Sequence, residues 1–252
     1  MKALILPLLA LLLGGCVGHG HWGEAAGLPS RGQLSEAAVN AVKAPQTWVP
    51  LAAAGLLLAT DVDQKWSEEL YEKQPLFGDD ARSVSNDLRD IASGAYVLTA
   101  LLAPSPTWEA KAKGFAVGAR TALLDGAINH SLKEAIGRER PDGERDSSMP
   151  SGHASKAASR TMLARYNLRY IDMPEWSRQV ADWTLHGVAL GTGLARVEAG
   201  KHHLSDVMVG YAIGNFLAAF MHEAFFTGGS GGVQISFVPV PEGGAFSLTV
   251  PL

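Results

Sequence analysis

The chain has 252 residues, of which 47% are hydrophobic and 18% are charged. This composition supports a sizeable apolar core and argues against disorder over most of the length. The formal net charge of −4 at pH 7 excludes a globally basic surface. Nucleic-acid binding therefore has little support, and any anion site must be a local concentration of positive charge.

Residues 1–15 have the layout of a bacterial export signal, with Lys2 at a positive start and an apolar stretch too short for a comfortable membrane span. The small residues before Cys16 resemble a lipobox, which implies cleavage before Cys16 and acylation of its thiol. The alternative is an ordinary signal peptide with an incidental cysteine. Because Cys16 is the only cysteine in the sequence, no intrachain disulfide is possible.

Residues 16–45 lack an apolar period and are rich in small and charged residues, which predicts a tether between an anchor and a folded domain. A helical domain is expected over 46–227. Its first apolar run, 48–60, would form a helix of ~20 Å at ~1.5 Å per residue. The hydrocarbon core of a membrane is ~30 Å thick, so the run is interpreted as a buried helix rather than a span.

The site-bearing helices are predicted from caps and breakers. One helix is expected from Trp108, with Thr107 as its N-cap, to about Ile136. Pro141 forbids its continuation, and a new helix is expected to begin at Ser151. Two more are expected at about 178–196 and 205–226. In residues 228–252 a Gly-rich linker precedes two alternating apolar stretches, which predicts a β-hairpin. The expected fold is mainly α, a helical bundle with a short C-terminal β-hairpin.

Three short clusters of basic and polar residues lie between Lys133 and Asp206. In the first, Lys133 and Arg140 are about two helical turns apart, although Gly137 and Pro141 place Arg140 in a loop. An arginine fork meets two phosphate oxygens, and a lysine adds a compact charge. Alone, the pair is more simply explained as a solvated basic helix end.

The second cluster, Ser151-Gly152-His153, stands where a loop becomes a helix. Helix N-termini present unpaired N–H groups to anions, and Gly152 would let the backbone approach a ligand. Ser151 can cap the helix, and His153 can donate a proton near neutral pH. Alone, these residues could be a plain N-cap followed by an exposed histidine.

The third cluster contains Arg196, His202 and Asp206. His202 and Asp206 are one helical turn apart and can form a hydrogen bond. A carboxylate on one imidazole nitrogen fixes the tautomer and leaves the other nitrogen free to attack. Arg196 adds positive charge nearby. Alone, the histidine and aspartate could be a structural pair.

In this order, Lys-x6-Arg-Pro, Pro-Ser-Gly-His and Arg-x5-His-x3-Asp resemble the motifs of the type 2 phosphatidic acid phosphatase (PAP2) superfamily, which also holds bacterial acid phosphatases and vanadium haloperoxidases. The resemblance covers roughly residues 110–226. It departs from the family pattern at Ala195, where a serine is usual, so a hydroxyl hydrogen bond from that position is absent.

The resemblance implies that Lys133, Arg140 and Arg196 hold the phosphate oxygens. The N–H groups of Ser151 and Gly152 would assist them. The cationic side chains would supply the charge stabilisation, so neither a metal nor a cofactor is expected.

The resemblance also implies the catalytic roles. His202 would attack phosphorus in line to form a phosphohistidine, and Asp206 would orient His202. His153 would protonate the leaving oxygen and then activate water.

The expected function is therefore hydrolysis of a phosphate ester or diphosphate, either of a membrane lipid or of a small soluble molecule. The expected location is the bacterial cell envelope, facing the periplasm, with the lipid on Cys16 in the outer membrane. Two alternatives stay open: a vanadium-dependent haloperoxidase with the same site, and a noncatalytic envelope lipoprotein that binds anionic lipid. The sequence does not indicate an oligomeric state.

Overall fold

The computed structural model describes residues 21–144 and 147–226, and the backbone of 234–240 and 243–249. The predicted signal segment and Cys16 lie outside the described residues. In chain order the described elements are α2 (Arg31–Lys43), α3 (Pro45–Leu58), α4 (Val62–Lys73), η1 (Gly78–Asp80), α5 (Ala81–Leu102), α6 (Trp108–Ile136), α7 (Gly152–Leu168), α8 (Glu175–Glu198), α9 (Leu204–Phe226), β1 (Gln234–Val240) and β2 (Gly243–Thr249). The prediction of a mainly helical fold is confirmed.

The helix starts follow the capping residues. The Thr107 hydroxyl accepts a hydrogen bond from the N–H of Ala110, and α6 begins at Trp108 as predicted. The buried Ser151 hydroxyl accepts from the N–H of Ala154, and α7 begins at Gly152. Each bond satisfies one N–H group that has no partner within the helix.

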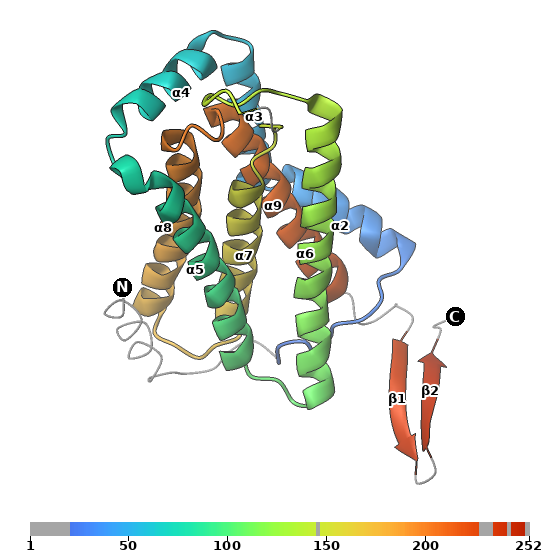
Figure 1. The fold of residues 1–252 in the computed structure, drawn as a ribbon. Helices are drawn as coiled ribbons and strands as arrows, with labels where there is room; N and C mark the ends of the chain where they lie inside the picture. Colours follow the sequence, from blue (N-terminus) through green and yellow to red (C-terminus); the bar gives the residue numbers. More distant parts are fainter. Residues whose placement is uncertain (1–20, 145–146, 227–233, 241–242, 250–252) are drawn as a thin grey trace.

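Helix α7 lies at the centre of the bundle, packed against α5, α6, α8 and α9 (Figure 1). Most of its side chains are buried on all sides, although its sequence is not strongly apolar. Small residues allow this burial. A Cβ atom placed on Gly214 of α9 would lie 2.2 Å from the carbonyl oxygen of Ser155 on α7. Only a glycine lets these two backbones approach so closely.

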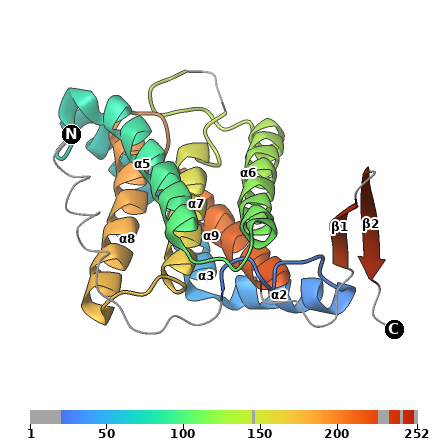
Figure 2. The same cartoon turned by 90° about the horizontal axis from the view of Figure 1, so that it is seen from below.

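The tether prediction is wrong for the described part of residues 16–45. Trp22 is only 1% exposed, and its indole N–H donates to Oδ1 of Asn167 on α7 at 2.7 Å. Helix α2 then packs along α9, beside α3 (Figure 2). The sequence concealed this because one tryptophan and the small residues Ala37 and Ala41 provide the contact instead of an apolar stripe.

The prediction of a buried helix at 48–60 is also wrong. In α3 only Thr47 and Ala54 are buried, whereas Leu56 is 73% exposed. Its apolar composition therefore serves an outer surface rather than the core. Among the described residues, one helix, α9, is long and apolar enough to cross a membrane, but 61% of its most apolar window is buried inside the bundle. A core helix has the same property.

The two strands near the C-terminal end pair antiparallel, with Phe237 opposite Phe246. They form a two-stranded sheet of their own.

Candidate active site

The three sequence clusters meet at one end of the bundle, the upper end in Figure 1. There α6 and α8 end, α7 and α9 begin, and the loop after α6 crosses between them. Helix α5 runs beside α7 and α8 and brings further side chains to the same end. Residues that lie up to 142 positions apart in the sequence are thereby brought into contact, as the distances below show.

His202 lies in the short segment between α8 and α9 and is only 2% exposed. Its Nδ1 lies 2.7 Å from the backbone carbonyl oxygen of Ser148, to which it donates a hydrogen bond. Because that bond fixes the proton on Nδ1, the Nε2 atom carries the lone pair. Burial, together with the charges of Arg196 and Lys133, lowers the pKa of His202 well below its ordinary value, so the imidazole is neutral at pH 7.

The sequence predicted a direct hydrogen bond between Asp206 and His202. The structure does not contain it, because Oδ2 of Asp206 lies 4.0 Å from Nδ1 of His202. It acts through Ser148 instead. The Ser148 hydroxyl donates to Oδ2 at 2.5 Å, and the carbonyl of the same residue accepts from His202. The backbone N–H of His203 also donates to Oδ2, at 2.7 Å. Burial alone would raise the pKa of Asp206, but hydrogen bonds from His203 and Ser148 and the charge of Arg138 hold it at about 2.

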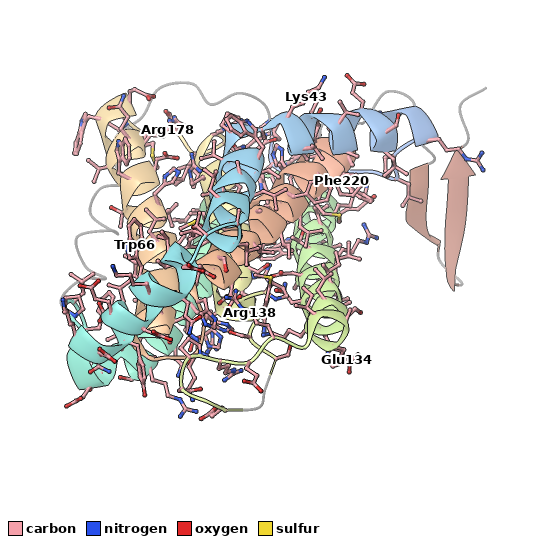
Figure 3. All side chains as sticks on the ribbon, turned by 90° about the horizontal axis from the view of Figure 1, so that it is seen from above. Lys43, Trp66, Glu134, Arg138, Arg178 and Phe220 are labelled. Carbon is pink, nitrogen blue, oxygen red and sulfur yellow. The ribbon has the colours of Figure 1, made fainter. Side chains whose placement is uncertain are left out.

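Arg138, from the first motif's variable stretch, and Asp63, from outside the three motifs, fix the start of α9. Arg138 donates to Asp206 and to Asp63 at 2.8 Å each, and Asp63 accepts the N–H of Ser205 at 2.9 Å. In Figure 3 the side chain of Arg138 lies between α4, which carries Asp63, and the end of α6. This network holds Asp206, and with it the segment that carries His202, against α4.

His153, in the first turn of α7, contacts α5. Its Nε2 lies 2.8 Å from Nη1 of Arg89 and 2.9 Å from Oδ1 of Asn86. Burial and the charges of Arg196, Arg89 and Lys156 lower the pKa of His153 to about 3. Without a bound anion, His153 is therefore neutral at pH 7.

Arg196 is a deeply buried cation of the site. It is 6% exposed, and its buried Nε atom has no hydrogen-bond partner among the described residues. Burial, followed by the charges of Arg140, Arg82 and Arg89, lowers its pKa to about 10. A buried guanidinium surrounded by like charges is costly unless an anion compensates it. The arrangement therefore favours an oxyanion.

The other predicted phosphate ligands lie around Arg196 and His202. Lys133 donates to the carbonyl oxygen of Ser147 at 2.7 Å, and its charge acts on His202. Arg140 lies 3.3 Å from Glu144, and its charge acts on both Arg196 and His202. Lys133 is thus partly engaged in holding the loop after α6.

Ser151 and Gly152 form the backbone corner at the start of α7. The N–H of Ser151 donates to the carbonyl oxygen of Asp206 at 2.9 Å, so this group is already engaged within the chain. A Cβ atom on Gly152 would meet no protein atom within 4 Å. Packing within the chain therefore does not require glycine at this position.

The described residues do not offer a cluster of side chains that could bind a metal ion. In the ranges 21–144 and 147–226, no group of three or more His, Cys, Asp or Glu side chains could hold an ion. Two carboxylates at this end of the bundle, Asp206 and Asp63, are engaged by Arg138.

Sequence reasoning missed Asp63, Asn86, Arg89 and Ser148. None of them lies in a motif, and Asp63 and Arg89 come from helices more than forty residues before the first cluster. Arg138 lies inside that cluster, between Lys133 and Arg140. Its charge could have identified it as a site residue from the sequence alone.

Comparison with known proteins agrees with this geometry. Residues 115–229 match the model of the PAP2 superfamily. A lipid A 1-phosphatase of Porphyromonas gingivalis is 39% identical over 93 residues, which are 37% of this chain and 19% of that protein. A phosphatidylglycerophosphatase B of Bacillus subtilis is 30% identical over 107 residues, 40% of this chain and 52% of that protein. The matches thus span about half or less of these relatives.

A solved structure has a similar fold. The transmembrane PAP2 type phosphatidylglycerolphosphate phosphatase of Bacillus subtilis superposes with a TM-score of 0.52 and 22% sequence identity. The superposition covers 71% of this chain and 94% of that one. The prediction of a PAP2-like region is confirmed: residues 115–229, which contain all the predicted catalytic and phosphate-binding residues, match the PAP2 superfamily, and the chain is similar to lipid phosphatases of that family.

Proposed function

We propose that this protein is a metal-independent phosphatase that hydrolyses a phosphate ester or diphosphate of a membrane lipid through a phosphohistidine intermediate. The observation that carries the proposal is the buried Arg196, which lies among like charges beside two neutral histidines. The names of the similar proteins, two of them phosphatases of lipid A or phosphatidylglycerophosphate, support the choice of a lipid.

The geometry suits nucleophilic attack by His202. Its Nε2 lone pair is available because Nδ1 donates to the Ser148 carbonyl. The N–P bond forms as the P–O bond to the leaving group breaks. The electron pair of that bond stays on the leaving oxygen, which takes a proton from His153 where it leaves as an alkoxide. Asp206 stabilises the positive charge that develops on the ring through Ser148, and Arg196 holds the transferring phosphoryl oxygens. His153 then takes a proton from the water that hydrolyses the intermediate.

The outer surface of the bundle suits contact with a lipid bilayer. Large apolar side chains are exposed on several helices, such as Leu56 on α3, Leu101 on α5, Leu123 on α6 and Trp183 on α8, with exposed fractions from 59% to 75%. Exposed apolar area of this kind is unusual on a monomeric soluble protein. We propose that this surface holds the protein at the membrane, together with a lipid on Cys16 if the predicted signal is processed.

Phosphate release from purified protein tests the proposal. The panel should include lipid monophosphates, lipid diphosphates and soluble phosphoesters, each assayed with and without EDTA. We expect release by the wild type in EDTA and a loss of at least about a hundredfold in His202→Gln, since the nucleophile is gone. His186→Gln, on α8 away from the motifs, is the matched control and should keep full activity. If the wild type releases phosphate from no substrate, the proposal fails.

A further inference from the structure

The contact between His153 and α5 has a consequence for substrate choice. In the proposed reaction, the Nε2 atom of His153 faces the oxygen that leaves. Nη1 of Arg89 lies 2.8 Å from this same atom. An arginine is always charged and can only donate, so its positive charge stands on the leaving-group side of the site. None of the three motifs contains Arg89.

Arg89 is positioned to serve a ligand rather than the fold alone. Its other guanidinium nitrogens pair with Asp90, whose side chain is 66% exposed. A pair so open to water contributes little and leaves the charge only weakly compensated. Arg82 lies seven residues earlier, on the same face of α5, and its charge also acts on Arg196. Helix α5 therefore adds two cations next to the phosphate ligands of the motifs.

The effect of the Arg89 charge depends on which group leaves. An alkoxide leaving from a phosphate monoester is strongly basic and needs a proton from His153. An arginine donating to Nε2 opposes that protonation. A phosphate leaving from a diphosphate is a much weaker base, with a pKa near 6, and can depart as an anion. The electron pair of the broken P–O bond then stays on the leaving phosphate, whose charge Arg89 neutralises without any proton transfer.

We propose that Arg89, aided by Arg82, forms a second oxyanion subsite that binds the leaving phosphate and makes lipid diphosphates the preferred substrates. This proposal deepens the function proposed above, and its kinetic arm rests on that function.

The test compares two substrates that differ by one phosphate. The full chain in detergent micelles is assayed with a prenyl diphosphate and the prenyl monophosphate of equal chain length. We expect the wild type to favour the diphosphate in kcat/KM, and Arg89→Gln to lower that preference at least about tenfold, since a charge-assisted hydrogen bond is lost. Arg89→Lys should restore part of it. Lys113→Gln, an exposed charge loss at the far end of α6, should not change the ratio.

A binding measurement separates this proposal from the phosphatase proposal. Methylenediphosphonate, which cannot be hydrolysed, and methylphosphonate are titrated into the same variants by calorimetry. We expect the diphosphonate to bind more tightly, and Arg89→Gln to remove most of that advantage. If the protein releases no phosphate yet shows this pattern, the subsite stands and the phosphatase proposal fails. If Arg89→Gln weakens both substrates and both phosphonates equally, Arg89 merely positions His153 and the subsite proposal is overturned.

Discussion

At the scale of single residues, the two site histidines are neutral for reasons that suit different steps. His202 is buried, and its proton is fixed on Nδ1 by a carbonyl oxygen, which leaves the lone pair on Nε2 for the proposed attack. His153 is neutral because of burial and because Arg196 and Arg89 stand beside it. A phosphate that binds to these arginines offsets their charge and raises the pKa of His153. In the proposed mechanism, substrate binding therefore prepares His153 for proton transfer.

Asp63 gives a test of how the site is positioned. It accepts hydrogen bonds from Ser205 and Arg138 but lies outside the motifs. In Asp63→Asn the charge opposite Arg138 is lost, and we expect a loss of about 1–3 kcal/mol in the free energy of unfolding. Because the segment carrying His202 then moves relative to the bound phosphate, kcat should fall about tenfold or more with little change in KM.

Asp61→Asn is the matched control for Asp63→Asn. Asp61 is exposed and makes no side-chain capping bond at the start of α4. It should leave both denaturant unfolding and phosphate release unchanged. A variant at Asp63 that unfolds more readily but retains the wild-type kcat would show that Asp63 is structural only.

His222 gives a test of pH-dependent stability. It lies partly buried on α9, stacked between Tyr166 and Phe226, and its pKa is lowered to about 3 by burial and then by the charge of Arg169. Below pH 6.5 the unfolded chain binds a proton at this histidine and the folded protein does not. Its contribution to stability is therefore complete above pH 6.5 and is lost progressively as the pH falls towards 3.

The substitution His222→Phe removes this titration and keeps an aromatic ring between its neighbours. Between pH 7 and pH 5 the variant should lose about 2 kcal/mol less unfolding free energy than the wild type. Urea unfolding at the two pH values measures the difference. An identical loss in both proteins would show that His222 titrates normally in the folded state.

At the scale of the elements, the contact between α7 and α9 depends on glycine. A Cβ atom on Gly214 would meet backbone atoms of α7 at 2.2 and 2.9 Å, whereas one on Gly187 of α8 meets nothing within 4 Å. We expect Gly214→Ala to cost about 1–3 kcal/mol, because backbone cannot give way as a side chain does. Gly187→Ala should stabilise slightly, by up to about 1 kcal/mol, through helix propensity. Thermal unfolding that ranks the two variants in the opposite order would contradict this packing.

The elements that the sequence predicted are those with local signals. Helix α6 matches the prediction at both ends, because Thr107 caps its start and Gly137 ends it with a positive φ of 61°. The start of α7 was equally readable from Ser151. By contrast, the docking of Trp22 onto Asn167 joins residues 145 positions apart, and no local pattern encodes such a contact.

The residues of the candidate site also fall into those that the sequence predicted and those that it did not. The motif residues could be found because their spacing is fixed within short segments. Arg89 could not, since its role depends on how α5 packs beside α7. Even within a motif, the spacing of His202 and Asp206 suggested a direct bond, whereas the fold inserts Ser148 between them. Spacing thus identified the participants but not which atoms they contact.

At the scale of the whole molecule, the charged site occupies one end of a bundle whose sides carry exposed apolar residues. A lipid substrate has the same division, with a charged head and apolar chains. A bundle that contacts the bilayer with its sides would bring the head group to the arginines while the chains stay in an apolar medium. On this proposal, membrane contact is a property of the folded domain and does not depend on an N-terminal lipid.

Removing the predicted anchor tests that independence. A Cys16→Ser variant, expressed behind an export signal without a lipobox, should stay in the membrane fraction after an alkaline carbonate wash. Replacing the exposed Leu56, Leu101 and Leu123 by Ser in the same background should release folded protein, because each such change removes about 2 kcal/mol of favourable transfer at a bilayer while disturbing no core contact. Unchanged thermal unfolding of the released variant is the control. A Cys16→Ser protein that is folded but fully soluble would show that the lipid alone holds the enzyme at the membrane.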